Sequence, residues 1–353
     1  MKRFILALAA GVSLVACKDS PVESVNAAEC AARSRLAPAM SLAGAPARSR
    51  QLESPRIVIE IPIRGVAVTN DAVVAGMDAS GAATWSKATG VLRLTAMSVV
   101  RDYNAAGQAA GISGSKFVLL EKNGKVVEIG EGDGALGINS QGWVAGTQER
   151  AFFWTPCSGL KTLLPESTPD TNYISTATDI NVRGDIVGHF TYTTREEPEN
   201  AQQRAIVWTA WSDRWVGITR SHGEHNYANA INDRGAVVGS SGSWGSHRRY
   251  QDWVAFIWTA EGGVISIPRP ADTDVAAATD INNLNEVVGS AHLLGYNRSH
   301  AWVWRKETGT ELLPAMGQAN STATAINDWG DIIGTVDDQP VVWTWPENAH
   351  RWR

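Results

Sequence analysis

The sequence of 353 residues has little net charge and no long run of like charges. Lysine and arginine number 31 against 36 aspartates and glutamates, so the net charge is −5 at pH 7. A protein that binds nucleic acid needs a basic surface to neutralise phosphates, and this acidic balance argues against such a partner. Low-complexity tracts are also lacking, and 44% of the residues are hydrophobic. The composition is globular, and at this length several domains or a modular architecture is expected.

Common catalytic motifs are missing as well. The sequence contains no G-x-S-x-G, H-E-x-x-H, C-x-x-C or P-loop pattern. One G-x-G-x-x-G pattern runs from Gly132 to Gly137, but it precedes an expected strand and no helix follows it. Because a pyrophosphate would need the N-terminus of a helix, we interpret this pattern as a turn. The sequence therefore gives no direct indication of an enzyme.

The hydrophobic run from Phe4 to Val15 is too short to span a bilayer as a stable anchor. It follows Lys2 and Arg3 and ends in "LVAC", which resembles the lipobox of bacterial lipoproteins. The resemblance implies that residues 1–16 are a signal peptide and that Cys17 is acylated. An ordinary secretory signal with an incidental cysteine is the alternative.

Several acyl chains on Cys17 would make a durable membrane anchor. Lys18 stands where an inner-membrane retention signal would place aspartate, so we expect the outer membrane or the cell surface. Residues 17–54 are rich in Ala, Ser, Arg and Pro without apolar periodicity, which predicts a flexible tether. The other two cysteines, Cys30 and Cys157, can form a disulfide in an export compartment or remain free thiols.

A repeated segment accounts for most of the remaining chain. It has the form I-N-x-x-G-x-V-V-G and occurs seven times, at spacings of 34 to 51 residues that are typical of solenoids and propellers. We number the copies as repeats one to seven by an asparagine that each contains: Asn70, Asn104, Asn139, Asn181, Asn232, Asn282 and Asn327.

In each repeat, the N-x-x-G pattern predicts the turn of a β-hairpin. The asparagine side chain can accept a backbone N–H, and the fourth residue needs a positive φ, which glycine supplies in five repeats and Asn285 in the sixth. A glycine about seven residues after the asparagine indicates close backbone approach. An "AxxWT" strand and a "GVxxL" strand follow, with no helical period between them. Four short antiparallel strands per repeat predict a blade of an all-β propeller.

The third strand of four repeats carries "RAFFWT", "RAIVWT", "VAFIWT" and "HAWVWR". This pattern resembles the HAF-repeat family of predicted extracellular proteins, over residues 56–345. The resemblance implies a repeat architecture and says almost nothing about activity. Six tryptophans share one position in the repeat, and we expect them to pack between blades: Trp85, Trp154, Trp208, Trp258, Trp304 and Trp343.

Repeat seven lacks a fourth strand, whereas the unassigned strand "RIVIEIPI" precedes repeat one. We therefore expect a seven-bladed β-propeller over residues 55–346, closed by pairing of residues 57–61 with residues 341–345. Residues 347–353 are expected to form a C-terminal tail.

Repeats four to six have longer connections between their second and third strands than repeats one to three. Long connections on a rigid scaffold often carry function. They and the neighbouring connections gather aromatic residues that could stack on a sugar or a peptide, or pack among themselves: Tyr173, Tyr192, Tyr227, Trp244, Tyr250, Trp253 and Tyr296.

The densest polar cluster in these connections is "HGEH", with His222, Glu224 and His225. Two histidines and a carboxylate could hold a divalent metal, with His189, His247 or His292 from neighbouring loops. Such a metal could serve a polysaccharide lyase or hydrolase, which is the alternative to a non-catalytic function. A solvated polar loop without a metal is the other interpretation of this cluster. We expect a monomeric, non-catalytic cell-envelope lipoprotein without a cofactor, which binds a glycan or a protein partner through these loops.

Overall fold

The computed structural model describes residues 57–132, 134, 136–163, 171–194, 201–209, 214–218, 225–244, 250–293, 298–315 and 319–353. These residues form 28 β-strands and one short 3-10 helix, which confirms the expected all-β class. Within the described ranges, no helix is long and apolar enough to cross a membrane.

Repeats one to three each form a four-stranded antiparallel sheet with its strands in chain order. Repeat one supplies β2 (Arg64–Val68), β3 (Val74–Asp78), β4 (Gly81–Ser86) and β5 (Gly90–Arg93). Repeat two supplies β6 (Val99–Tyr103), β7 (Ala109–Ser113), β8 (Lys116–Leu120) and β9 (Val126–Glu131). Repeat three has the short strands β10 (Leu136–Ile138), β11 (Val144–Thr147), β12 (Ala151–Thr155) and β13 (Gly159–Thr162).

Repeats four to six follow the same order with longer inner strands. Repeat four supplies β14 (Thr171–Ile180), β15 (Ile186–Thr194), β16 (Gln202–Trp208) and β17 (Trp215–Ile218). Repeat five supplies β18 (His225–Ile231), β19 (Val237–Trp244), β20 (Tyr250–Thr259) and β21 (Gly263–Ser266). Repeat six supplies β22 (Thr273–Ile281), β23 (Val287–Leu293), β24 (Ser299–Arg305) and β25 (Gly309–Leu312). One parallel bridge, between Gln203 and His225, joins the sheets of repeats four and five.

Repeat seven supplies three strands, β26 (Ser321–Ile326), β27 (Ile332–Val336) and β28 (Gln339–Thr344). The N-terminal strand β1 (Ile57–Glu60) pairs antiparallel with β28, so that Ile57 lies opposite Thr344 and Glu60 opposite Val341. This register agrees with the pairing expected between residues 57–61 and 341–345.

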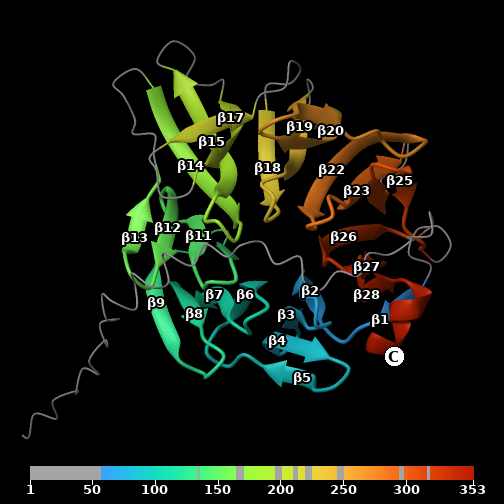
Figure 1. Ribbon diagram of the computed structural model, residues 1–353, viewed down its shortest axis with the longest axis horizontal. Helices are drawn as coiled ribbons and strands as arrows, with labels where there is room; N and C mark the ends of the chain where they lie inside the picture. Colours follow the sequence, from blue (N-terminus) through green and yellow to red (C-terminus); the bar gives the residue numbers. More distant parts are fainter. Residues whose placement is uncertain are drawn as a thin grey trace, which may run out of the picture.

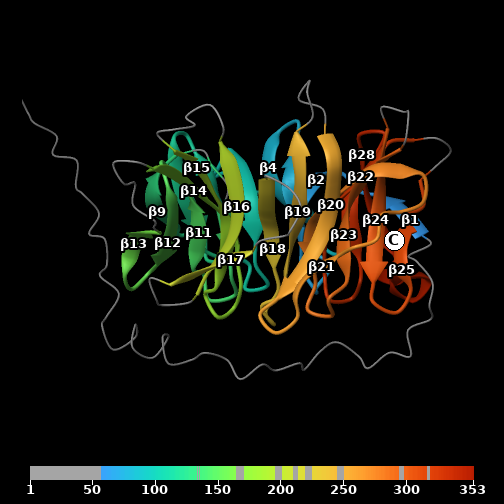
Figure 2. The ribbon, with the colours of Figure 1, turned by 90° about the horizontal axis from the view of Figure 1, so that it is seen from above.

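The sheets lie side by side around a central axis, in chain order, with the last beside the first (Figure 1). Seen from the side, most strands run between the two flat ends of the molecule (Figure 2). This radial stacking of antiparallel sheets is the β-propeller arrangement. We call the end that carries the N-x-x-G turns the turn end, and the end that carries the connections between second and third strands the loop end.

The turns have the expected geometry in six repeats. The turn asparagine accepts backbone N–H groups through Oδ1, as Asn232 does from Arg234 and Ala236 at 3.1 and 2.9 Å. Repeat one corrects the sequence alignment. Thr69, and not Asn70, begins its turn, since the N–H of Ala72 donates to the carbonyl of Thr69. The threonine hydroxyl takes the place of the amide oxygen by accepting the N–H of Val73 at 3.3 Å.

The glycine seven residues after the turn asparagine marks close backbone contact, as expected. At Gly188, a Cβ atom would lie 1.9 Å from the carbonyl oxygen of Thr176 on the first strand. Gly239 and Gly334 show the same 1.9 Å contact with the carbonyls of Tyr227 and Thr322. A side chain at this position would therefore force the first two strands apart.

Hydrophobic clusters fill the spaces between consecutive sheets. Seven clusters of buried residues occur in the described part of the chain, and each combines residues of two neighbouring repeats. One of them joins repeat seven to repeat one through Ile333 and Val74. The shared tryptophan position lies in these layers: Trp343 is fully buried, and its indole N–H donates to the carbonyl of Pro314 at 2.7 Å. Packing between blades is therefore the role of this position.

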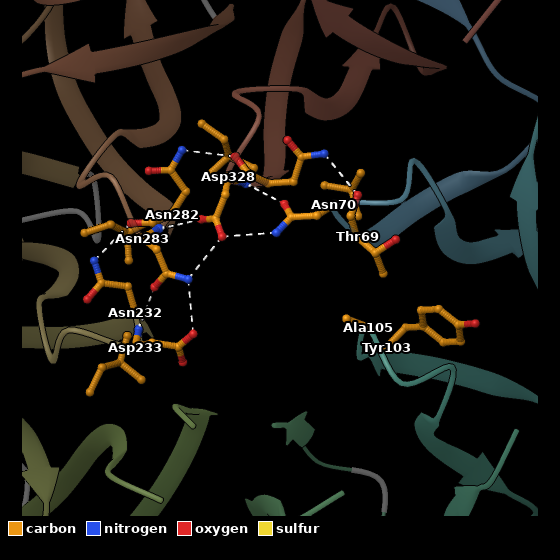
Figure 3. Close-up of a pocket in the computed structure, with 14 residues that line it drawn as sticks. Thr69, Asn70, Tyr103, Ala105, Asn232, Asp233, Asn282, Asn283 and Asp328 are labelled. Atoms are coloured by element: carbon orange, nitrogen blue, oxygen red, sulfur yellow. Dashed lines mark hydrogen bonds between the residues drawn. The ribbon is translucent and has the colours of Figure 1, made fainter. Parts of the chain in front are cut away.

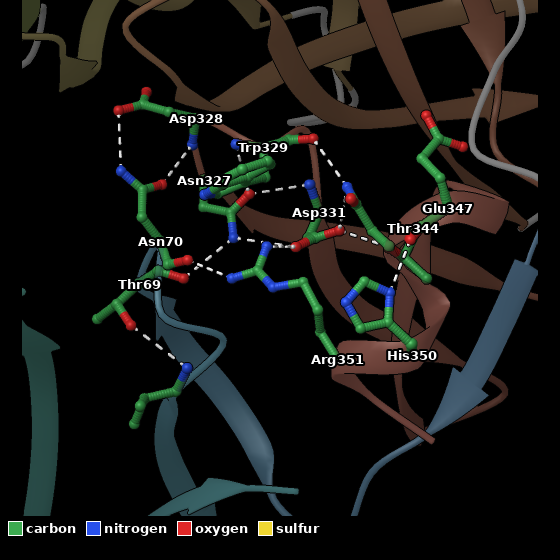
Figure 4. Close-up of polar contacts among 12 residues, drawn as sticks. Thr69, Asn70, Asn327, Asp328, Trp329, Asp331, Thr344, Glu347, His350 and Arg351 are labelled. Carbon is green, nitrogen blue, oxygen red and sulfur yellow. Dashed lines mark hydrogen bonds and ion pairs between the residues drawn. The ribbon is translucent and has the colours of Figure 1, made fainter. Parts of the chain in front are cut away.

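The C-terminal residues are ordered, which corrects the expectation of a tail. Pro346–Arg351 forms the 3-10 helix η1, and Figure 1 places the C-terminus beside β1 and β28. Arg351 forms an ion pair with the fully buried Asp331 at 3.1 Å, and its guanidinium lies over the ring of Trp329. It also donates to the carbonyl of Asn70 in repeat one (Figure 4). Trp352 stacks on Trp85, so the segment bridges repeats seven and one.

Candidate functional site

A chain of asparagines links the repeats at the turn end. The Nδ2 group of each turn asparagine donates to the carbonyl of the turn residue in the next repeat. The donor–acceptor distances are 2.8 Å from Asn104, 3.0 Å from Asn139, 3.3 Å from Asn181, 2.9 Å from Asn232, 3.0 Å from Asn282 and 3.0 Å from Asn327. The last link ends on Thr69 of repeat one, whose side chain has no amide to extend it. These asparagines are buried and hold neighbouring repeats in register.

A second row of polar side chains lies beside this chain of asparagines, at the next position of each turn. Asp233, Asn283, Asp328 and Asn70, which we call the polar arc, come from repeats five, six, seven and one. Each accepts a backbone N–H from the preceding repeat, at 2.8 to 2.9 Å. The amide of Asn283 also donates to Asp233 and Asp328 at 3.1 and 3.2 Å. Repeats two to four place Ala105, Ser140 and Val182 at this position.

The polar arc lines a cavity on the axis, with a volume of about 230 Å³. Figure 3 shows the arc on one side of this axial pocket and Tyr103 with Ala105 on the other. The arc's side chains already bond to one another and to the backbone. The free lone pairs of its two carboxylates could accept further hydrogen bonds. The arrangement serves mainly to hold the repeats together.

Three half-buried aspartates lie on the axis, around a cavity of about 240 Å³. Asp102, Asp179 and Asp280 belong to repeats two, four and six. Each carboxylate accepts the N–H of the following residue at 2.7 Å and an N–H of the next repeat at 2.8 Å. The three carboxyls therefore also join neighbouring repeats.

Burial changes the acidity of these three carboxyls. Loss of solvation raises the pKa of Asp102 to about 6 and that of Asp280 to about 7, although their backbone hydrogen bonds lower it. Burial likewise raises the pKa of Asp179 well above its usual range, and the negative charge of Asp102 adds to the effect. Asp102 and Asp280 consequently titrate closer to neutral pH than an exposed carboxyl does.

At the loop end, the sheet of repeat four extends past that of repeat three. Its second strand, β15, has 9 residues, whereas β11 of repeat three has 4 and ends in a tight turn closed by Gln148 and Arg150. One face of the longer sheet is therefore only partly covered near its end. We define the ledge as the side chains grouped on this face: Tyr173, Phe190, Tyr192, Gln202, Arg204 and Trp215.

The ledge follows cross-strand pairs, which place neighbouring side chains on one face of a sheet. Tyr173 lies opposite Tyr192, and Tyr192 lies opposite Gln202. The tyrosine ring centroids are 6.2 Å apart, and the hydroxyl of Tyr192 donates to Oε1 of Gln202 at 2.6 Å. Phe190 is buried beneath them, in edge contact with Trp215 at 5.4 Å.

Arg204 is the cation of the ledge. It lies opposite Phe190 in the sheet, and its guanidinium carbon is 6.0 Å from the Phe190 centroid and 5.6 Å from that of Tyr192. Among the described residues no carboxylate forms an ion pair with it. The side chains of Tyr173, Tyr192 and Arg204 are half-buried, and Trp215 is 39% exposed. The ledge thus offers flat rings, an amide and a cation to solvent.

The structure brings two of the expected ligand-binding residues into the ledge, Tyr173 and Tyr192. Two more, Tyr227 and Trp253, stack on each other in repeat five with centroids 5.5 Å apart. Trp253 is only 5% exposed, so it packs within the fold and presents no open face. The side chains of Trp244 and Tyr250, and the whole of Tyr296, lie outside the described residues.

The expected metal ligands are only partly described. His222 and Glu224 lie outside the described residues, as does His247, whereas His225 is buried with Nδ1 against Oε1 of Gln203. Burial lowers the pKa of His189 to about 4, so this ring is neutral, and it contacts Tyr227 edge-on. In the described ranges, no three His, Cys, Asp or Glu side chains are grouped as metal ligands would be.

The expected lipidation site Cys17 and the cysteine Cys30 lie outside the described residues. Cys157, in the turn between β12 and β13, is disulfide-bonded. Its pairing with Cys30 stays a prediction.

The polar arc, the three axial aspartates and Arg204 were not among the functional residues expected from the sequence. The aspartates were visible as an acidic residue two positions before the turn asparagine in repeats two, four and six. The arc was visible as Asp or Asn directly after the turn residue in repeats five to seven and one. Arg204 gave a weaker signal, because a charged residue near the start of a third strand is ordinary.

Comparison with known families gives a match over the C-terminal part of the chain. The model of the family described as "Protein of unknown function (DUF3466)" matches residues 138–344, which is more than half of the chain. The resemblance to HAF repeats stays a prediction. No curated protein matches the sequence.

Solved structures with a similar fold have low sequence identity. The β-propeller domain of the Trilobed protease from Pyrococcus furiosus is 12% identical, with a TM-score of 0.50, covering 78% of this chain and 90% of that chain. Virginiamycin B lyase from Staphylococcus aureus is 12% identical, with a TM-score of 0.47, covering 81% of this chain and 98% of that chain. At 12% identity, the likeness to the Trilobed protease domain supports the β-propeller fold alone.

Proposed function

The chain belongs to the DUF3466 family of proteins of unknown function, and we propose that it is a non-catalytic binding protein of the cell envelope. Its β-propeller binds a glycan at the loop end of repeat four. The observation that carries this proposal is the ledge, where Tyr173, Tyr192 and Trp215 offer aromatic rings beside the amide of Gln202 and the cation of Arg204. Aromatic faces pack against the C–H faces of sugar rings, and the polar groups bind hydroxyl and carboxylate oxygens. A peptide partner is the other outcome that the binding assay would reveal.

The proposal includes a ring of seven blades, closed where β1 completes the sheet of repeat seven. Seven sequence repeats support this count, and so do the seven hydrophobic clusters between consecutive repeats. The β1–β28 pairing and the contacts of the C-terminal segment with repeat one support closure. A closed ring leaves no unpaired edge at the seam.

We also propose that acylated Cys17 anchors the protein to the outer membrane and that Cys30 is the disulfide partner of Cys157. The chain enters the fold at the turn end, because Ile57 lies opposite Thr344, whose hydroxyl donates to Asp331 beside the last turn. The ledge at the opposite end would then face away from the membrane. Cys17→Ala should abolish labelling with palmitate, and continued labelling would refute the anchor.

The test of the binding function is an array of glycans, peptidoglycan fragments and peptides, probed with the purified protein. We expect binding to a glycan, and a loss of tenfold or more in affinity for Tyr192→Ala, with a melting temperature close to that of the wild type. Tyr103→Ala, which truncates a half-buried tyrosine that lines the axial pocket and packs between repeats one and two, is the matched control and should bind normally. Binding that survives Tyr192→Ala but is lost in Tyr103→Ala would place the ligand at the turn end. A blank array would refute the proposed function.

A further inference from the structure

Arg204 is a cation without a carboxylate partner in the described part of a chain that carries a net charge of −5. Other arginines of the fold do have carboxylate partners. Arg305 pairs with Glu286 at 2.8 Å and Arg93 with Asp78 at 2.6 Å. Arg204 instead lies over two aromatic rings, which hold its guanidinium in place while part of the side chain stays exposed. A guanidinium held in this way is positioned to bind an anion.

We propose that the ledge binds an acidic glycan and that Arg204 receives the carboxylate of a uronic acid residue. This inference rests on the proposed function, because it names the ligand class of the same site. The charge of Arg204 requires an anionic group on the ligand, and the planar guanidinium fits a carboxylate through two parallel hydrogen bonds.

The neighbouring groups of the ledge are donors that complement a sugar acid. The hydroxyl of Tyr192 donates to Oε1 of Gln202, which leaves the Nε2 group of Gln202 for an oxygen of the ligand. Phe190 beneath them closes the floor of the ledge, so the ligand sits against apolar rings. An inorganic anion alone would use the cation and leave the rings of Tyr173 and Tyr192 uncovered. A saccharide that carries a carboxylate uses both.

The glycine at position 217 contributes to this arrangement. A Cβ atom there would lie 3.6 Å from Cδ of Arg204 and 3.7 Å from Cζ3 of Trp215. The outer strand therefore presents bare backbone where these two side chains lie, and the aliphatic stem of Arg204 extends along it.

The experiment compares two ligands that differ only in charge. Titration calorimetry with the purified protein would measure the affinity for a β-1,4-linked mannuronic acid tetramer and for β-1,4-mannotetraose, its neutral counterpart. We expect the acidic tetramer to bind at least tenfold more tightly. Arg204→Gln should abolish this preference, so that the two tetramers bind with similar affinity, since one charge-assisted contact accounts for the difference.

Arg64→Gln is the matched control, because it removes the same charge from an exposed side chain of repeat one. It should keep the preference for the acidic tetramer. Equal affinity of the wild type for both tetramers would overturn the inference and leave glycan binding intact. A preference lost equally in Arg64→Gln and Arg204→Gln would also overturn it, since net charge alone would then explain it. If neither tetramer binds, the acidic-glycan assignment is wrong, and the array decides whether the binding function also fails.

Discussion

The two ends of the molecule use polar side chains in different ways. At the turn end, the turn asparagines are buried and the axial aspartates are half-buried, and both kinds of side chain bond to the neighbouring repeat, so these polar groups hold adjacent sheets together. At the loop end of repeat four, Arg204 and Gln202 are partly exposed and keep hydrogen-bonding capacity. The comparison indicates that a regularly repeated polar residue serves the fold, whereas a polar residue found in one repeat is the better candidate for binding. Substitutions at the turn end should therefore change stability, and those on the ledge should change affinity.

The largest loss of stability is expected from Arg305→Ala in repeat six. Its partner Glu286 has a side chain only 3% exposed, and removal of the guanidinium breaks the ion pair that this buried carboxylate makes at 2.8 Å. Breaking a buried ion pair in this way costs about 3–5 kcal/mol. Denaturant unfolding would measure it. A double variant, Arg305→Met with Glu286→Gln, should recover most of the loss, and a single variant that loses less than about 1 kcal/mol would contradict the account.

Arg351→Ala should have the next largest effect. This side chain joins Asp331 of repeat seven to the carbonyl of Asn70 in repeat one, and its loss removes a charge-assisted contact from a fully buried carboxylate. We expect the free energy of unfolding to fall by about 2–3 kcal/mol. Arg353→Ala, at the exposed end of the same segment, should change it little. Equal effects of the two variants would show that Arg351 does not hold the seam.

The half-buried aspartates on the axis predict that stability depends on pH. Their pKa is raised in the folded state, to about 6 for Asp102 and about 7 for Asp280, against about 4 in the unfolded chain. The folded protein therefore binds more protons between pH 4 and 7, and its stability falls as the pH rises through this window. We expect the melting temperature to be higher at pH 5 than at pH 8. Asp280→Asn should flatten this profile, and an unchanged profile would show that Asp280 does not titrate there.

Much of the fold was readable from the sequence because its signals repeat. The turn asparagine, the glycine after it and the shared tryptophan occur often enough to fix the strand order, the β1–β28 register and the packing layers. Two features escaped. Thr69 begins the first turn although the neighbouring Asn70 fits the pattern by letter, because a threonine hydroxyl can accept the same N–H. The C-terminal helix escaped because its contacts, such as Arg351 with Asp331, join residues that no local pattern connects.

The candidate site was less predictable, because it too depends on contacts that no local sequence pattern connects. Tyr173 and Tyr192 were expected at the loop end, but whether an aromatic residue faces solvent or a neighbouring sheet depends on the relative lengths of adjacent sheets. Trp253 packs within the fold whereas Trp215 is 39% exposed, although each stands in a strand and precedes a valine. Arg204 became a candidate only when its lack of a carboxylate partner was visible.

The smallest effect should come from Thr69→Asn. This substitution offers an amide at the one turn that has none and could extend the chain of asparagine links towards repeat two. A gain of up to about 1 kcal/mol is expected from one additional hydrogen bond. Denaturant unfolding of the variant beside Thr69→Ala would measure it, since the alanine variant also loses the hydroxyl that accepts the N–H of Val73. An asparagine variant no more stable than the alanine variant would show that this turn cannot accept the motif.

Amide hydrogen exchange of the purified protein, with and without the mannuronic acid tetramer, tests the central comparison most directly. The account predicts slower exchange on ligand addition in residues 186–194 and 202–208, which form the ledge strands β15 and β16. Exchange in the turns at residues 232–236, 282–286 and 327–331 should stay slow and unchanged. Ligand-induced protection at these turns, with none in the ledge strands, would contradict the account and place binding at the turn end.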